Sequence, residues 1–149
     1  MAGGGGDEGL IRPDTLRRLA AEKDAERLKE ALRRQQRAEE ERAAFHRMFE
    51  TREVRPEEAN REISALVRRA AEDGKREVML FRFPSEWCSD KGRAINRFDP
   101  DWPETLTGFA KRGYEFYEKE LRPAGDRIRV QLLDYPGGVP GDVGAFLSW

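Results

Sequence analysis

The chain has 149 residues, of which 38% are charged and 38% are hydrophobic. Its 28 basic and 29 acidic residues leave a net charge of -1, which excludes a uniformly basic surface for binding nucleic acid. A single cysteine excludes an intrachain disulfide, and no stretch approaches the roughly 20 apolar residues of a membrane-spanning helix. No apolar signal segment opens the chain, so we expect a cytoplasmic protein without membrane contact.

The first residues form a glycine-rich, acidic tract without an apolar pattern. Such a composition cannot bury enough apolar surface to order the backbone. We therefore predict a disordered tail over residues 1–12.

A long charged helix is predicted for residues 13–53. Pro13 suits a first helical turn, where its missing N–H needs no partner. Neither glycine nor proline occurs from Leu16 to Phe49, and the residues there are mainly good helix formers. Opposite charges four residues apart, such as Glu30 and Arg34, support the helix locally.

The apolar stripe of this helix is thin, so the helix cannot lie deep in a core. The heptad pattern is also too irregular for a strong coiled coil. A helix with so little apolar surface is weakly stable alone and gains most by pairing. We expect self-association, or docking to a larger protein partner, through Leu16, Leu19, Leu28, Leu32, Phe45 and Phe49.

Residues 54–149 are predicted to form a compact domain. Proline opens its helices, and Asp73-Gly74 reads as a helix stop. Apolar runs and alternation mark its strands. The predicted elements are a helix from Pro56 to Asp73, a strand over Glu77–Phe83, a loop with a short helix over Ser85–Asn96, a helix from Pro103 to Leu121, and strands over Arg127–Tyr135 and Val143–Trp149.

The strand, helix and strand from Glu77 to Tyr135 predict a right-handed crossover, which makes these two strands parallel. The final strand should turn back antiparallel. We therefore expect an α+β or α/β fold, in which a long charged N-terminal helix precedes a small, three-stranded mixed sheet covered by helices on one face.

Two polar, glycine-rich segments follow the two parallel strands, and ligands often bind beyond the carboxyl ends of such strands. We expect both segments to meet at one edge of the sheet. Trp87 would offer a flat contact, Lys91 and Arg93 positive charge, and Asp134 and Asp142 acceptors. Two capped turns that hold a small sheet together are the structural alternative.

Catalytic and metal sites are not indicated. A nucleophilic cysteine needs a base, and the only histidine, His46, lies on the charged helix far in sequence from Cys88. One cysteine and one histidine do not supply a common zinc site, and the glycines near residue 138 are not followed by a phosphate-binding Lys-Ser/Thr pair. We predict no catalytic residue, no metal and no cofactor.

The sequence therefore predicts a non-enzymatic binding or regulatory protein, with a helix for association and an α/β recognition domain. The first alternative is a small enzyme or polar-ligand-binding domain that uses the two loops at Trp87–Arg93 and Asp134–Asp142. The second alternative is an arginine-dependent nucleic-acid adaptor. It is less favoured, because acidic residues such as Glu39-Glu40-Glu41 interrupt the arginine pairs and would repel phosphate.

Overall fold

The computed structural model describes residues 11–149, so the predicted tail over residues 1–12 falls outside them except for Ile11 and Arg12. The chain divides into two units, Met1–His46 and Arg47–Trp149. The division falls inside the long helix, and the predicted domain boundary between residues 53 and 54 stays a prediction.

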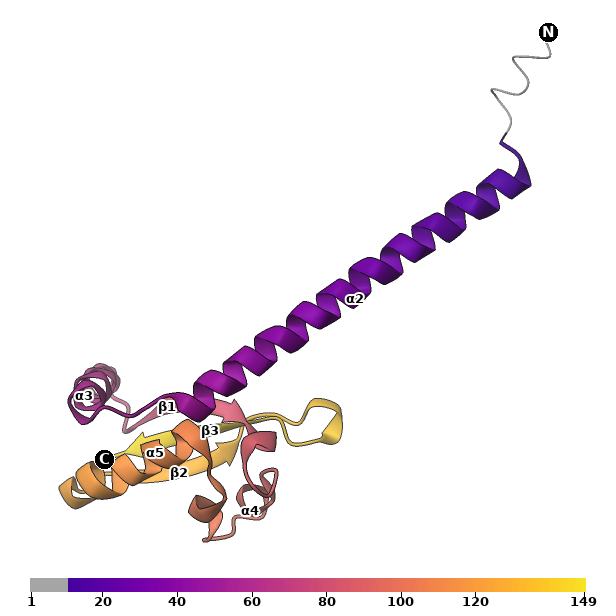
Figure 1. Ribbon diagram of the computed structural model, residues 1–149. Helices are drawn as coiled ribbons and strands as arrows, with labels where there is room; N and C mark the ends of the chain where they lie inside the picture. Colours follow the sequence, from indigo (N-terminus) through magenta and orange to yellow (C-terminus); the bar gives the residue numbers. More distant parts are fainter. Residues whose placement is uncertain (1–10) are drawn as a thin grey trace. The chain divides into compact units, whose positions relative to one another are not determined.

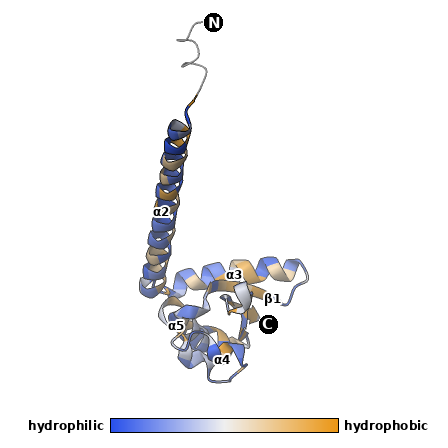
Figure 2. Cartoon of the chain, turned by 90° about the vertical axis from the view of Figure 1, so that its right-hand side faces the viewer, coloured by the Kyte–Doolittle hydropathy of each residue, from blue (hydrophilic) through white to orange (hydrophobic). Residues whose placement is uncertain are grey.

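The predicted charged helix is present as α2 (Pro13–Thr51), with 39 residues (Figure 1). In the part of α2 that belongs to the first unit, nearly every residue is exposed. Figure 2 shows that most residues of this helix are hydrophilic and that apolar residues are scattered among them. Three exposed ion pairs at a spacing of three residues lie on it, including Lys23–Glu26 at 3.5 Å and Asp24–Arg27 at 3.6 Å. Such pairs contribute little stability in water, so the helix depends on good intrinsic propensity.

The second unit begins with the end of α2 and continues with α3 (Pro56–Glu72). Pro56 occupies the first turn, and Glu57 and Glu58 interact favourably with the helix dipole there. At the other end, Gly74 has a φ of 78°, its N–H donates to Ala71 O at 3.0 Å, and Lys75 N–H donates to Ala70 O at 2.8 Å. These two bonds form a Schellman motif, which confirms the predicted stop.

The sheet has three strands, β1 (Glu77–Pro84), β2 (Arg127–Leu132) and β3 (Asp142–Ser148), in the order β1-β3-β2. Both neighbouring pairs are antiparallel, so the predicted mixed sheet is wrong. The reason is that β3 inserts between β1 and β2. These two strands still run in the same direction, as the predicted crossover requires, but they do not pair with each other.

The connections are short helices and turns: η1 (Ser85–Trp87), α4 (Arg93–Asn96), η2 (Trp102–Thr105), α5 (Gly108–Phe116), the π-helix η3 (Tyr117–Leu121), η4 (Arg122–Ala124) and η5 (Pro136–Gly138). The helix predicted from Pro103 to Leu121 is therefore interrupted. Thr107 is extended, and Gly108 has a φ of 51°, which only glycine adopts readily. The continuous helix begins at Gly108.

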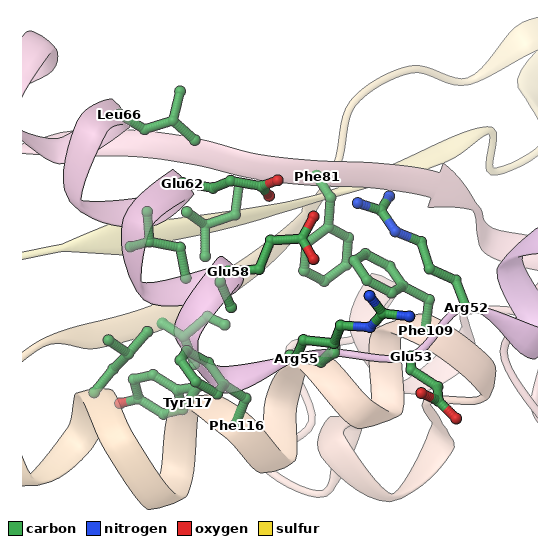
Figure 3. A pocket seen from close by; sticks show the side chains of 17 residues that line it. Arg52, Glu53, Arg55, Glu58, Glu62, Leu66, Phe81, Phe109, Phe116 and Tyr117 are labelled. Atoms are coloured by element: carbon green, nitrogen blue, oxygen red, sulfur yellow. The ribbon is translucent and has the colours of Figure 1, made fainter.

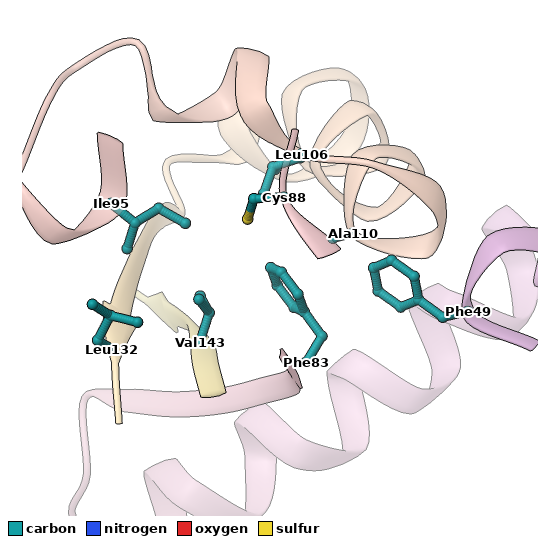
Figure 4. Close-up of a cluster of buried hydrophobic side chains, with 8 residues drawn as sticks. All are labelled: Phe49, Phe83, Cys88, Ile95, Leu106, Ala110, Leu132 and Val143. Carbon is teal, nitrogen blue, oxygen red and sulfur yellow. The ribbon is translucent and has the colours of Figure 1, made fainter. Parts of the chain in front are cut away.

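One face of the sheet carries the core, and the opposite face is open within residues 47–149. Val143, Ala145 and Leu147 of β3 are at most 1% exposed on the core face. The open face carries ion pairs between Arg82 and Asp142 at 2.9 Å and between Arg129 and Glu77 at 2.6 Å. The core cluster contains Phe49, Phe83, Cys88, Ile95, Leu106, Ala110, Leu132 and Val143 (Figure 4).

Candidate functional site

The segments that follow β1 and β2 meet at one end of the sheet. Ser85 is buried, its N–H donates to Gly141 O at 2.9 Å, and its hydroxyl donates to Pro140 O at 3.1 Å. Gly92 lies close to Ser85 as well, because a Cβ at Gly92 would lie 2.8 Å from Ser85 Cβ. Hydrogen bonds of Ser85 therefore join the two loops, and close packing of Gly92 against Ser85 compacts the first loop.

The two predicted acceptors of this edge bind groups of the chain itself. Asp134 Oδ1 accepts a hydrogen bond from Asp142 N–H at 2.8 Å. The Asp142 carboxylate accepts two bonds from the Arg82 guanidinium, at 2.9 and 3.1 Å. Gly141 packs against the Asp134 carboxylate so closely that no Cβ fits between them. These interactions fix the loop that precedes β3.

The other three residues predicted for this edge do not bind the two carboxylates. Trp87 packs against the core, with its ring centroid 4.7 Å from that of Phe49. Lys91 and Arg93 are exposed beside a turn in which the Asp90 carboxylate accepts from Gly92 N–H and Ala94 N–H, at 2.9 and 2.8 Å. Ligand binding by Trp87, Lys91 and Arg93 stays a prediction.

Cys88 is 4% exposed and belongs to the core cluster. Burial raises the pKa of its thiol from 9.0 to about 11, against a smaller opposing effect of hydrogen bonding from Thr105. The thiol is therefore protonated at neutral pH and is a poor nucleophile. Among residues 11–149, no group of three or more His, Cys, Asp or Glu side chains is arranged to hold a metal ion.

The buried thiol has a measurable consequence. We expect Cys88 to react with iodoacetamide at neutral pH at least ~100-fold more slowly in the folded chain than in urea, because a pKa raised from 9.0 to about 11 lowers the thiolate fraction by that factor. Mass spectrometry measures the adduct, and Cys88→Ser is the blank. Equal rates in both states would contradict the buried thiol.

The same shift fixes the pH dependence of stability. Because the folded state holds the protonated thiol more strongly, the contribution of Cys88 is complete below the ordinary pKa of 9.0 and is lost as pH rises through about 11. Chemical denaturation across this range should show wild type losing more stability than Cys88→Ser.

A groove that the sequence did not predict lies between α3, the core face of the sheet and α5 with η3 (Figure 3). Its volume is about 130 Å³. Its walls are mainly apolar and come from α3, β1, α5, η3 and β2, with Ile63, Leu66, Leu80, Phe81, Phe109 and Phe116 among the lining residues. A space of this size accepts a single aromatic ring or a branched aliphatic group.

A β-bulge shapes this groove. The pairing of β1 with β3 shifts between Met79, which is opposite Phe146, and Phe81, which is opposite Ala145. Leu80 is the extra residue, so both Leu80 and Phe81 line the groove. The unbroken apolar run from Val78 to Phe81, where an alternating strand would have a polar residue, was the available signal in the sequence.

Charged side chains surround the opening of the groove. Glu58 and Glu62 lie one turn apart on α3, and Arg52 lies over the Phe109 ring, with 4.5 Å between its guanidinium carbon and the ring centroid. Within residues 47–149, no ion pair joins Glu58 or Glu62 to a basic side chain. The groove thus combines an apolar interior with charged residues of both signs, since Arg52 and Arg55 line it together with Glu58 and Glu62.

The predicted association residues do not share one face of α2. A regular helix turns by roughly 100° per residue, so Leu28 and Leu32 lie about 120° and 160° round the axis from Leu16. Phe45 returns to within about 20° of Leu16 by the same count. Leu16, Leu19, Leu28, Leu32 and Phe45 are between 47% and 61% exposed.

Phe49, the sixth predicted association residue, is only 7% exposed and lies in the core of the second unit. It is therefore a packing residue of the compact domain. The sequence could not separate it from Phe45, because both are aromatic residues near the end of the same apolar patch.

No protein-family model matches the chain, and neither a curated protein nor a solved structure shows significant similarity to it. Over residues 11–149, no helix combines the length and the apolar character that crossing a bilayer requires.

Proposed function

We propose that this chain is a non-enzymatic binding protein of the cytoplasm that self-associates through α2 and carries a recognition domain in residues 47–149. The observation that carries this proposal is the exposure of α2, whose Leu28 and Leu32 are 61% and 54% exposed. A single solvated helix gains stability by burying such residues against a partner. A second copy of the chain is the partner that we favour.

The spacing of apolar residues in the middle of α2 supports pairing. Ala21, Ala25, Leu28 and Leu32 follow one another at steps of four, three and four residues. These are alternating a and d positions of a heptad, and they form a short seam on one side of the helix. The seam ends where polar residues occupy the same positions, at Arg18 before it and at Gln35 and Glu39 after it.

The charges beside the seam favour a parallel, in-register pair of identical helices. In that arrangement a g residue faces the e residue five positions later on the other helix. Here Arg17 would face Glu22, and Asp24 would face Lys29. Both pairs are attractive and occur twice by symmetry, so a second copy of α2 is complementary to the first.

Sedimentation equilibrium from micromolar to millimolar concentration tests the proposal. We expect Leu28→Lys with Leu32→Lys to weaken the association at least ~10-fold, because each burial of leucine contributes about 1.5–3 kcal/mol. Leu16→Lys with Leu19→Lys is the matched control on another face and should change the association little. A wild type that stays monomeric throughout would exclude self-association.

A charge exchange tests the parallel orientation in the same measurement. Asp24→Lys alone and Lys29→Asp alone should each weaken the pair, because like charges then face each other across the seam. The double variant should recover most of the wild-type affinity. An unchanged affinity in both single variants would contradict the parallel register.

The alternative adaptor role would appear as salt-dependent binding of RNA or DNA.

A further inference from the structure

The outer edge of β2 has unpaired backbone groups. Leu133 N–H donates to Asp142 O at 2.8 Å, and antiparallel pairs alternate between bonded and non-bonded positions. By the continuous register of β2 with β3, Arg129 and Gln131 therefore bond to β3. Ile128 and Val130 direct their N–H and C=O groups outward, and no hydrogen bond within residues 11–149 uses these groups.

The two edges of the sheet differ in protection. β1 contains the bulge at Leu80, ends at Pro84, which has no N–H, and packs against α3. Bulges and prolines are the usual means by which a sheet edge avoids further pairing. β2 has neither a bulge nor a proline, its register is unbroken from Arg127 to Leu132, and the helix that contacts it is the short α4. The outer edge of β2 can therefore form backbone hydrogen bonds with another strand.

An aromatic groove runs along this edge, with a volume of about 660 Å³. Phe98, Trp102 and Tyr135 line it beside the β2 backbone. Phe98 is 89% exposed and has a φ of 55°, an unfavourable conformation for a bulky residue. Backbone bonds of the same turn, such as Asp99 N–H to Ala94 O at 2.9 Å, hold it there. The turn thus presents a large apolar ring to solvent.

The uncompensated charge in this groove is negative. Arg129 lines it, but its guanidinium donates to both Glu77 carboxylate oxygens, at 2.6 and 2.7 Å. Asp99 also lines it; its Oδ1 accepts a hydrogen bond from Asp101 N–H at 2.9 Å, and no ion pair within residues 11–149 neutralises its carboxylate. A basic residue on the occupant would supply the missing partner.

We propose that the β2 edge binds an extended segment of another protein, which adds to the sheet as a fourth strand. Its backbone would pair with Ile128 and Val130, its alternate apolar side chains would contact Phe98 and Trp102, and a basic residue would face Asp99. A second copy of β2 fits less well, because residues of the 95–102 segment line the groove beside β2 in both copies and would need the same space. This inference deepens the proposed function by naming the partner chemistry of the recognition domain.

The test uses the full chain and a phage-displayed library of random linear peptides, followed by fluorescence anisotropy with the enriched peptides. Enriched sequences should alternate apolar residues and carry Lys or Arg. Phe98→Gly should weaken binding at least ~10-fold without destabilising the fold, because glycine accepts a φ of 55°. Met79→Ala, an exposed apolar residue on β1, is the matched control and should bind like wild type.

Hydrogen exchange at single amides supplies the second readout. In the free chain, Ile128 and Val130 should exchange faster than Arg129 and Gln131, and an enriched peptide should slow the first two only. Absence of enriched peptides, or equal binding by Phe98→Gly, would overturn the proposal. Concentration-dependent protection of Ile128 and Val130 without peptide would show self-pairing and overturn it too. Self-association through α2 is measured separately by sedimentation, so the two failures are distinguishable.

Discussion

Replacing Phe49 by alanine is expected to lower the free energy of unfolding by about 3–5 kcal/mol. The side chain is 7% exposed, and its ring lies 5.4 Å from the Phe83 ring and 4.7 Å from the Trp87 ring, measured between centroids. Gly108 approaches it so closely that a Cβ there would lie 2.9 Å from Phe49 O. Because the surroundings are tightly packed, truncation leaves a cavity that cannot collapse fully.

Met48→Ala is the matched control for this prediction. Met48 is the preceding residue of α2 and is 61% exposed, so its truncation should cost less than about 1 kcal/mol. Urea denaturation followed by tryptophan fluorescence measures both variants. If Phe49→Ala and Met48→Ala lower the free energy of unfolding by similar small amounts, the Phe49 ring does not belong to the core.

Deleting residues 1–46 is expected to leave a cooperatively folding domain, whereas deleting residues 1–53 should abolish or nearly abolish folding. Residues 47–53 contribute backbone hydrogen-bond acceptors to the domain as well as the Phe49 side chain. The Arg112 guanidinium donates to Arg52 O at 2.8 Å, to Glu50 O at 2.7 Å and to Phe49 O at 3.3 Å. A cation at these terminal carbonyls also interacts favourably with the helix dipole.

The longer deletion removes the Phe49 ring and leaves the Arg112 donors without these acceptors. Together these losses approach the whole stability of a small domain, about 5–15 kcal/mol. Thermal unfolding followed by circular dichroism tests both deletions. A cooperative transition of similar midpoint in the two truncated chains would place the domain boundary after residue 53, where the sequence predicted it.

The candidate site was only partly predictable from sequence. The loops after β1 and β2 were expected to meet, and they do so through Ser85, Pro140 and Gly141. Their polar residues were expected to face a ligand, but Asp134 and Asp142 bind the chain itself. Composition shows which groups a loop contains, but only the folded backbone shows which of them it uses internally. The groove between α3 and α5 and the groove along β2 were not predicted, because residues far apart in the sequence line each of them.

The sequence by itself determined α2, α3, the positions of the three strands and the relative direction of β1 and β2, but not the interruption of the helix predicted from Pro103 to Leu121. Proline and glycine act within a few residues of their position, as at Pro56 and Gly74, and periodicity reports which face of an element is apolar. Crossover handedness then follows from local chain geometry. Only the tertiary structure decided that β3 lies between the other strands, that Leu80 forms a bulge and that Phe49 belongs to the core. Those outcomes depend on packing between distant segments, and local pattern does not encode which distant surfaces fit together.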